Sequence, residues 1–313
     1  MRIDGVACGV FLPQVGFDFA GLTERAIACE QAGLHSLWLA DHMWARSMPD
    51  ADYLECWTTL TALAMRTTTL RLGTLVLCNS YRNPALVAKM AATFDCISGG
   101  RLELGIGAGW MDEEYRGYGY HFPNARIRIE QLEEGLEVIQ RLFTTARSTL
   151  QGKYYALDDA PNNPKPVQTP VPPITIGGAG ERLLLKVVAK YADRWNCPIN
   201  AAHELPHKLE VLRLHCSEVG RDPTAITISE QVIVVLGADE VALAAKWALA
   251  KQLLGGFADL EAVAVRGTPD QVAEGLRAKA AKGVQLFTIM FGDMAAPETI
   301  RLFGERVLPA LAG

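Results

Sequence analysis

An acid and a base stand next to each other after an apolar segment near the start of the chain. In SLWLADHMW, residues 36–44, the apolar side chains predict a buried strand that ends at Asp41 and His42. A carboxylate and an imidazole are costly to bury unless each has a partner. An imidazole at a strand end can take up or release a proton near neutral pH. We therefore predict that Asp41 and His42 are catalytic and that Trp44 forms an apolar wall beside them.

A glycine-rich turn, GGAG at residues 177–180, lies between a short apolar segment and the helical pattern ERLLLKVVAKY. Backbone N–H groups at the start of a helix attract anions, and glycine lets a phosphate approach them closely. The turn lacks the Lys-Ser/Thr ending of a nucleotide-binding P-loop. We therefore predict that this turn holds a phosphate group that takes no part in nucleoside-triphosphate chemistry.

A second glycine pattern, GIGAGW at residues 105–110, places glycines at alternate positions of another apolar segment. Its spacing differs from the dinucleotide-binding fingerprint, and it does not open directly into a helix. Glycine at these positions permits the close approach of a ligand or of a neighbouring backbone. On these residues alone, a tight turn and a ligand contact are equally good interpretations.

The letters H-E-x-x-H also occur, at residues 203–207. A zinc protease needs both histidines of this motif on one continuous helix. Pro206 would remove a hydrogen bond and clash inside such a helix, and it suits instead the first turn of a helix that follows. We expect no metal site here, and the sequence predicts none elsewhere.

Short apolar segments alternate with longer helical patterns, which is typical of parallel strands joined by crossover helices. Eight strands in a chain of this length predict a TIM (β/α)8 barrel with insertions, an α/β fold, whereas a doubly wound open sheet is the competing fold. We predict strands at 6–12, 35–40, 70–78, 101–107, 173–177, 193–197, 226–236 and 284–291, and helices at 20–32, 55–66, 84–97, 126–143, 180–191 and 204–219.

Such a barrel would bring the segments that could do chemistry together. In TIM barrels the active site forms at the carboxyl ends of the strands. The strand at 35–40 ends at the acid and the base, and two later strands end at the glycine turns. We expect one domain, residues 1–313, with insertions near 108–125, 145–172 and 237–268.

The composition is that of an ordinary globular protein. Of the 313 residues 50% are hydrophobic and 21% charged, and the net charge of −5 argues against a basic face for nucleic acid. No apolar run is long enough to span a bilayer, and the start, MRIDGVACGVFLPQ, predicts a strand and not a signal peptide. The seven cysteines show no C-x-x-C spacing, so we expect buried thiols, a cytoplasmic location, and neither a membrane nor a nucleic-acid partner.

Several longer segments carry a family likeness: FLPQ, SLWLADHM, LRLGTLVLCNSYRNP, RLELGIGAGWMDEEYRGYGYHFP, PITIGGAGERLLLKVVAKYADRWN and VRGTPDQVAEGLRAKAAKGVQLFTIMF. Together they resemble the bacterial luciferase-like superfamily, in particular its oxidoreductases that use the deazaflavin coenzyme F420. The resemblance implies a TIM barrel, a homodimer, and hydride transfer between the reduced deazaflavin and a small organic substrate. The alternatives are an FMN-dependent monooxygenase that uses reduced flavin and oxygen, and a flavin-binding barrel without activity. The basic residues Arg46 and Arg82 favour the polyglutamate-tailed deazaflavin.

The resemblance also implies roles for particular residues. Asp41 and His42 line the pocket beside the redox-active ring, where Asp41 orients the histidine or holds a polar group of the cofactor. Residues 75–78 form a bulge under the central ring, with a cis peptide bond between Leu75 and Val76. The implied cofactor-binding residues are Leu75, Val76, Cys78, Gly107, Ala108, Gly109, Gly177, Gly178, Ala179 and Gly180.

One position departs from the pattern of the sugar-phosphate dehydrogenases in this superfamily. These carry a catalytic Glu directly after the first glycine turn, where this chain has Trp110. Glu113 and Glu114 follow closely, and the sequence does not say whether either replaces the missing acid. Trp44 and Trp110 would form an apolar substrate pocket, suited to a flat and weakly polar compound such as an enone, an imine or an aromatic.

Overall fold

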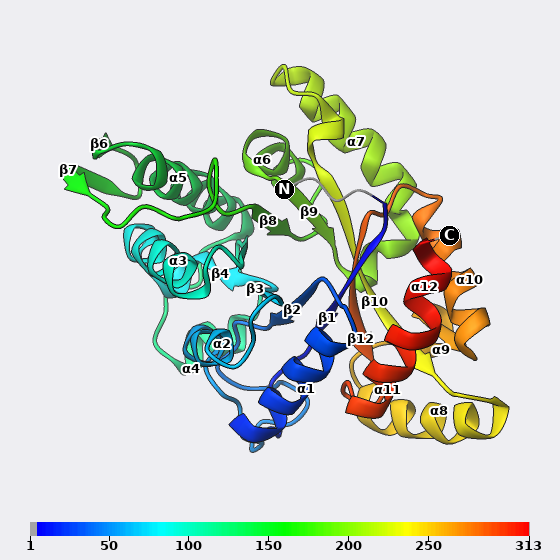
Figure 1. Cartoon of the computed structure of the whole chain (residues 1–313). Coiled ribbons are helices and arrows are strands. Elements are labelled where there is room, and N and C mark those ends of the chain that lie inside the picture. Colours follow the sequence, from blue (N-terminus) through cyan, green and yellow to red (C-terminus); the bar gives the residue numbers. More distant parts are fainter. Residues whose placement is uncertain (1–4, 313) are drawn as a thin grey trace.

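A closed barrel of parallel strands organises the chain in the computed structural model, which describes residues 5–312 (Figure 1). The barrel strands are β1 (Ala7–Phe11), β2 (Ser36–Leu39), β3 (Arg71–Thr74), β5 (Leu102–Gly107), β8 (Ile174–Gly177), β9 (Arg194–Cys197), β10 (Thr227–Leu236) and β12 (Leu286–Phe291). They pair in parallel, and the pairing of β9 with β10 closes the circle. The predicted TIM barrel is confirmed, and the open sheet is excluded. Of the predicted domain, residues 1–4 and 313 lie outside the described residues.

Helices cover the outside of the barrel (Figure 1). Pro84 occupies the first turn of its helix, and Thr268 and Gln271 close a capping box at the start of another. Within residues 5–312, none combines the length and the apolar composition needed to cross a membrane. The helices are α1 (Phe19–Gln31), α2 (Cys56–Ala64), α3 (Pro84–Ser98), α4 (Asp112–Gly117), α5 (Ala125–Thr144), α6 (Leu184–Tyr191), α7 (Leu205–Glu218), α8 (Glu240–Leu254), α9 (Leu260–Val263), α10 (Pro269–Ala280), α11 (Pro297–Leu302) and α12 (Leu308–Ala312).

Short additional strands supplement the barrel. β4 (Leu77–Cys78) pairs with β5, so the single strand predicted at 70–78 consists of two pieces, β3 and β4. In the proline-rich insertion, β6 (Arg147–Gln151) and β7 (Ala156–Pro161) form an antiparallel hairpin that projects beside α5 (green in Figure 1). β11 (Ala264–Gly267) extends the sheet next to β10. The sequence did not predict β11, because its few buried side chains leave no apolar run.

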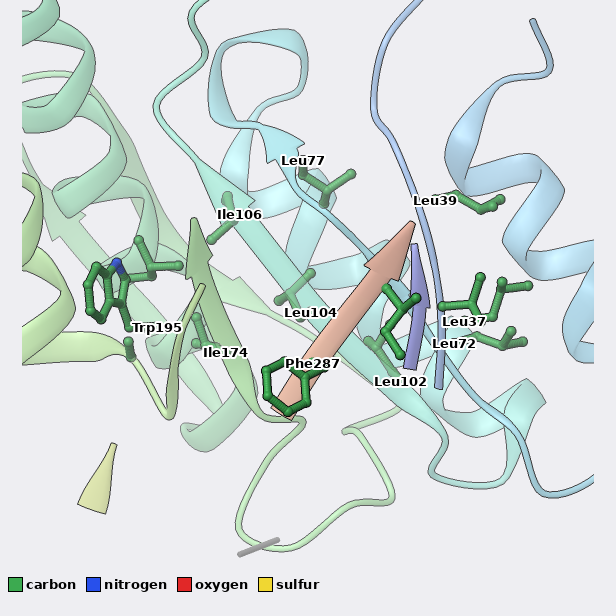
Figure 2. Packing of buried hydrophobic residues seen from close by; sticks show 14 of the residues in the cluster. Leu37, Leu39, Leu72, Leu77, Leu102, Leu104, Ile106, Ile174, Trp195 and Phe287 are labelled. Carbon is green, nitrogen blue, oxygen red and sulfur yellow. The ribbon is translucent and has the colours of Figure 1, made fainter. Parts of the chain in front are cut away.

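Apolar side chains that point away from the barrel axis form the main core between the strands and the helices. Figure 2 shows Leu37, Leu72 and Leu104 in this layer, all buried. Burying one such leucine contributes roughly 1.5–3 kcal/mol relative to leaving it exposed. Inside the barrel, Trp38 is fully buried next to Gly73, where a Cβ would lie 2.6 Å from the indole ring. The barrel interior is therefore a packed core and not a pore.

The start of the barrel strands encloses a buried group of charges. Glu103 on β5 contacts both Arg71 on β3 and Arg194 on β9, and Glu103 and Arg194 are almost fully excluded from solvent. Burial, together with the positive charge of Arg71, lowers the pKa of Arg194 to about 10. Sequence reasoning missed this cluster, because its three charges come from strands that are far apart in the chain. The cluster lies at the end of the barrel opposite to the strand ends that carry the predicted site.

Candidate active site

Asp41 follows β2 and connects it to the end of the neighbouring strand. Its buried carboxylate accepts a hydrogen bond from the Cys78 amide at 2.8 Å and two from Arg82, at 2.8 and 2.9 Å. Arg82 also donates to Glu55 at 2.7 Å. Burial lowers the pKa of Arg82, but the carboxylates of Asp41 and Glu55 outweigh it and raise the pKa above its ordinary value. Asp41 therefore pairs with Arg82 and not with His42, and the part of Arg82 in favouring a polyglutamate tail stays a prediction.

His42 has a partner of its own, Glu114 from α4. Its Nδ1 lies 2.9 Å from Oε2 of Glu114, which also accepts a 2.7 Å bond from the Tyr81 hydroxyl, while Oε1 accepts a 2.5 Å bond from the Met43 amide. The Glu114 side chain is 1% exposed and that of His42 is 28% exposed. Burial raises the pKa of Glu114, but these hydrogen bonds outweigh it and hold the pKa below its ordinary value. A partly exposed imidazole against a buried carboxylate is the arrangement of an acid–base group with an orienting partner.

Trp110, which stands in place of the acid found in sugar-phosphate dehydrogenases, lies beside His42. Its ring meets the imidazole edge-on, with 5.7 Å between ring centroids, and the residue is 61% exposed. Nearby, Arg46 and Glu113 form a 2.8 Å ion pair at the surface, which links the segment after β2 to α4. Trp44 is partly buried in that segment. The structure thus brings Trp110 to His42, and the part of Trp44 in a substrate pocket stays a prediction.

A bulge at the end of β3 forms a step at the same end of the barrel. The peptide bond between Leu75 and Val76 is cis, as predicted, and separates β3 from β4. Glycines on neighbouring strands make room for the step: a Cβ on Gly107 would lie 2.8 Å from Cγ2 of Val76, and one on Gly177 would lie 2.9 Å from its Cγ1. Carbon atoms pack at roughly 3.5–4.0 Å, so neither position has room for a side chain. The step therefore borders backbone that a flat ring could approach closely.

Gly109 and Cys78 serve the packing of the protein itself. Gly109 has a φ of +74°, and a Cβ there would lie 2.7 Å from Sγ of Cys78. The same sulfur lies 3.0 Å from the Tyr115 hydroxyl, and burial raises the pKa of the thiol to about 11. These contacts account for the glycine at position 109, whose part in cofactor binding stays a prediction.

The turn at residues 177–180, at the end of β8, is held by β9. Gly178 has a φ of +129°, a conformation that favours glycine. Its amide donates to the Asn196 carbonyl at 3.2 Å, and its carbonyl accepts a 2.8 Å bond from the indole of Trp195. The position of the turn is therefore fixed by the neighbouring barrel strand.

The helix after this turn starts later than predicted. α6 begins at Leu184 and not at residue 180, because a turn over residues 181–183 comes first. The prediction that the GGAG amides belong to a helix N-terminus is therefore wrong. Lys208 on α7 supports the turn instead, since its buried ammonium group donates to the Ala179 carbonyl at 3.2 Å and forms 2.9 Å ion pairs with Glu181 and Glu204.

The two histidines of the H-E-x-x-H sequence do not share a helix. His203 lies in a short 3-10 helix over residues 199–204, and His207 lies in α7. Pro206 occupies the first turn of α7, as predicted. His207 contacts the Glu181 carboxylate at 3.3 Å.

Sequence reasoning left the role of Glu114 open and assigned no role to Tyr81. Tyr81 follows β4, and Glu114 lies in the segment after β5. Both segments come directly after barrel strands, where active-site residues gather, and this position was the signal that could have found them. No local feature of MDEEYRG distinguishes Glu114 from Glu113.

Comparison with known proteins places the chain in a family. The family model for luciferase-like monooxygenases matches residues 6–257. The chain belongs to this family. Among relatives, an F420-dependent glucose-6-phosphate dehydrogenase of Amycolatopsis mediterranei is 36% identical over 176 residues, which is 55% of this chain and 50% of the relative. An F420-dependent hydroxymycolic acid dehydrogenase of Mycobacterium tuberculosis is 29% identical over 237 residues, 75% of this chain and 64% of the relative.

The match to these relatives is partial, whereas the match in fold is complete. The chain spans about half the length of the first curated relatives that it matches. A solved F420-dependent secondary alcohol dehydrogenase, in complex with an F420–acetone adduct, superposes with a TM-score of 0.83 at 21% identity and covers 98% of this chain and 99% of its own. This luciferase-like protein therefore shares the whole barrel with that structure.

Proposed function

We propose that this protein is an F420-dependent oxidoreductase that transfers a hydride between the deazaflavin and a small organic substrate. The observation that carries the proposal is the step at Val76, bordered by side-chain-free Gly107 and Gly177, at the same end of the barrel as His42. Support comes from family membership and from relatives that are themselves F420-dependent dehydrogenases. We take the whole chain, residues 1–313, as one luciferase-like barrel domain.

The residues at the step fit a flat tricyclic ring. A Cβ at either Gly107 or Gly177 would clash with the methyl groups of Val76, so these glycines let the bulge lie between the strand ends, where it can form the surface on which a ring lies. Leu75, Ala108 and the turn at 177–180 complete the proposed cofactor site, with the turn holding the phosphate and Lys208 holding the turn. When bound there, the deazaflavin supplies two-electron hydride chemistry.

His42 exchanges the proton that accompanies hydride transfer, since its partly exposed imidazole follows β2 at the same end of the barrel as the step. Asp41 is a positioning residue: through Arg82 and the Cys78 amide it fixes the end of β2 against β4. We expect His42→Ala to keep the fold and the affinity for F420 and to lower the hydride-transfer rate by roughly 10²–10⁴-fold. Single-turnover reoxidation of bound reduced F420 measures this rate, and a change within about threefold would make His42 a spectator.

The surroundings of His42 favour a weakly polar substrate. Trp110 places an exposed indole at the imidazole edge, where sugar-phosphate dehydrogenases of the superfamily carry an acid. With Trp44 it would form an apolar wall, which suits a flat enone, imine or aromatic compound. We further propose a cytoplasmic homodimer, on the basis of the family resemblance. Sedimentation equilibrium tests the dimer, and a monomer at micromolar concentration would contradict it.

A direct binding experiment decides between the cofactors. The purified chain is titrated with F420 and, separately, with FMN, and the fluorescence of each cofactor is followed. We expect saturable binding of F420 and much weaker binding of FMN. Tight binding of FMN with none of F420 would refute the proposal and favour an FMN-dependent monooxygenase. His42→Ala is the matched control, because it should bind F420 like the parent.

A further inference from the structure

From its contacts we infer that Glu114 is a positioning residue that holds His42 in the Nδ1–H form and leaves Nε2 to exchange the proton with the substrate. The inference rests on the proposed function, in which His42 is the proton-exchanging group. Glu114 reaches the imidazole from α4, a separate segment of the chain, and its side chain is 1% exposed.

The donors around Glu114 determine which imidazole nitrogen carries the proton. Its two oxygens meet the Met43 amide, the Tyr81 hydroxyl and Nδ1 of His42, at 2.5, 2.7 and 2.9 Å. An ionised carboxylate can only accept hydrogen bonds. These contacts keep the pKa of Glu114 below its ordinary value despite burial, so the carboxylate is ionised at neutral pH. Nδ1 must therefore be the donor, and in the neutral ring Nε2 carries the lone pair.

Other acids near His42 are occupied elsewhere. Asp41, although adjacent in sequence, has its oxygens bonded to Arg82 and to the Cys78 amide. Glu113 is 40% exposed and pairs with Arg46 at the surface. Glu114 is thus the acid that supplies the imidazole with an orienting carboxylate, and it does so although position 110 is a tryptophan.

This arrangement defines the proton balance of the reaction. With the deazaflavin bound, a substrate that is oxidised would give its X–H proton to Nε2 of His42, and its C–H hydrogen would leave with two electrons as a hydride to the oxidised cofactor. The positive charge formed on the imidazole then lies against the Glu114 carboxylate, which stabilises it. In the reverse direction Nε2 returns the proton to the reduced product, with the same partner at Nδ1.

The first test needs neither cofactor nor substrate. The chain contains six histidines, and ¹⁵N-histidine labelling with comparison to His42→Ala assigns the signal of His42. At a pH where the ring is neutral, we expect a protonated-type Nδ1 and an unprotonated-type Nε2. An Nε2–H form in the parent protein would overturn the inference, whatever cofactor binds.

The second test is Glu114→Gln, with Glu113→Gln as the matched surface control. In a glutamine whose amide oxygen keeps the bond from the Met43 amide, the NH₂ group takes the place of Oε2 and faces both the Tyr81 hydroxyl and Nδ1 of His42. Nδ1 must then accept a hydrogen bond, so the ring takes the opposite tautomer. We expect the Nε2–H signal in Glu114→Gln and a loss of hydride-transfer rate of roughly 10²–10⁴-fold, comparable to the loss when the orienting acid of a catalytic triad becomes an amide. Glu113→Gln should keep both the tautomer and the rate.

The outcomes separate this inference from the proposed function. A Glu114→Gln rate within about threefold of the parent would overturn the positioning role. Failure of the parent to bind F420 would refute the proposed function, while the tautomer measurement would still decide the state of His42. If Glu114→Gln does not fold, the spectrum of the parent decides alone.

Discussion

The step at Val76 can be tested by adding one carbon atom at Gly107. In Gly107→Ala the new Cβ would lie 2.8 Å from Cγ2 of Val76, about 0.7 Å inside the roughly 3.5 Å at which carbon atoms pack. Because Val76 is branched at Cβ, its side chain has little freedom to rotate away, and the bulge itself has to move. Overpacking of this kind costs about 1–3 kcal/mol of stability.

The functional effect should exceed the effect on stability. A misplacement of about 1 Å near reacting groups can cost roughly 10²-fold in rate, so we expect Gly107→Ala to lower hydride transfer by about 10- to 100-fold. Its affinity for F420 should fall by about tenfold or more, which corresponds to roughly 1.4 kcal/mol. Fluorescence titration with F420 and urea denaturation measure the two effects.

A control and a suppressor make the test specific. In Gly256→Ala, at an exposed position outside the proposed site, the Cβ would meet nothing within 4 Å, so this variant should keep its stability and its affinity. Val76→Ala removes the clashing methyl groups, and the double variant Gly107→Ala/Val76→Ala should be more stable than the sum of the single changes by about 0.5–3 kcal/mol. Unchanged F420 affinity in Gly107→Ala, or additive effects in the double variant, would refute the reasoning.

Two further predictions concern stability. Glu103→Gln leaves Arg71 and Arg194 without their buried partner and should lower the free energy of unfolding by about 3–5 kcal/mol in urea denaturation; a loss below about 1 kcal/mol would contradict the buried ion pair. The Glu30 carboxylate accepts hydrogen bonds from the backbone amides of residues 68–70. Burial raises the pKa of Glu30, but these hydrogen bonds outweigh it and lower the pKa from the ordinary 4.5 to about 2. A carboxyl group whose pKa is lowered on folding stabilises the protein at pH values above 4.5, and this contribution is lost as the pH falls towards 2. The parent should therefore be more stable than Glu30→Gln at pH 6, and the two should be similar in stability at pH 2. A gap that does not depend on pH would contradict the assignment.

The barrel could be predicted from the sequence because buried parallel strands leave continuous apolar runs. The run at 101–107 corresponds to β5 and the run at 284–291 to β12, within a residue or two. Strand ends were predicted well enough to place His42 at the catalytic end of the barrel. β11 was not predicted because its half-exposed residues show no periodic pattern. The start of α6 was predicted too early because the turn over 181–183 consists of residue types that favour helices.

Partners within the site could not be predicted in the same way. The bonds from His42 to Glu114 and from Arg82 to Asp41 join residues 72 and 41 positions apart. Spacing along one segment gives no information about such pairs, because they depend on how loops from different strands meet. Asp41 and His42 are neighbours in sequence, but their side chains bond to different partners, Arg82 and Glu114. The resemblance to a family predicted the cis peptide bond at Leu75–Val76, but it did not predict the role of Glu114.

The segment from Gly109 to Tyr115 contacts the histidine, the surface pair of Arg46 and the bulge, although it is only seven residues long. Trp110 meets the ring of His42, Glu113 pairs with Arg46, Glu114 bonds to Nδ1, and Tyr115 reaches Cys78 beside the bulge. In the proposed function, selectivity for a substrate and the protonation of the histidine would therefore both depend on this one short segment. Replacing Trp110 alone to fit a new substrate should leave the proton transfer by His42 unchanged. Exchanging the whole segment for that of a homologue would replace both the partner of His42 and the apolar side chain that faces the substrate.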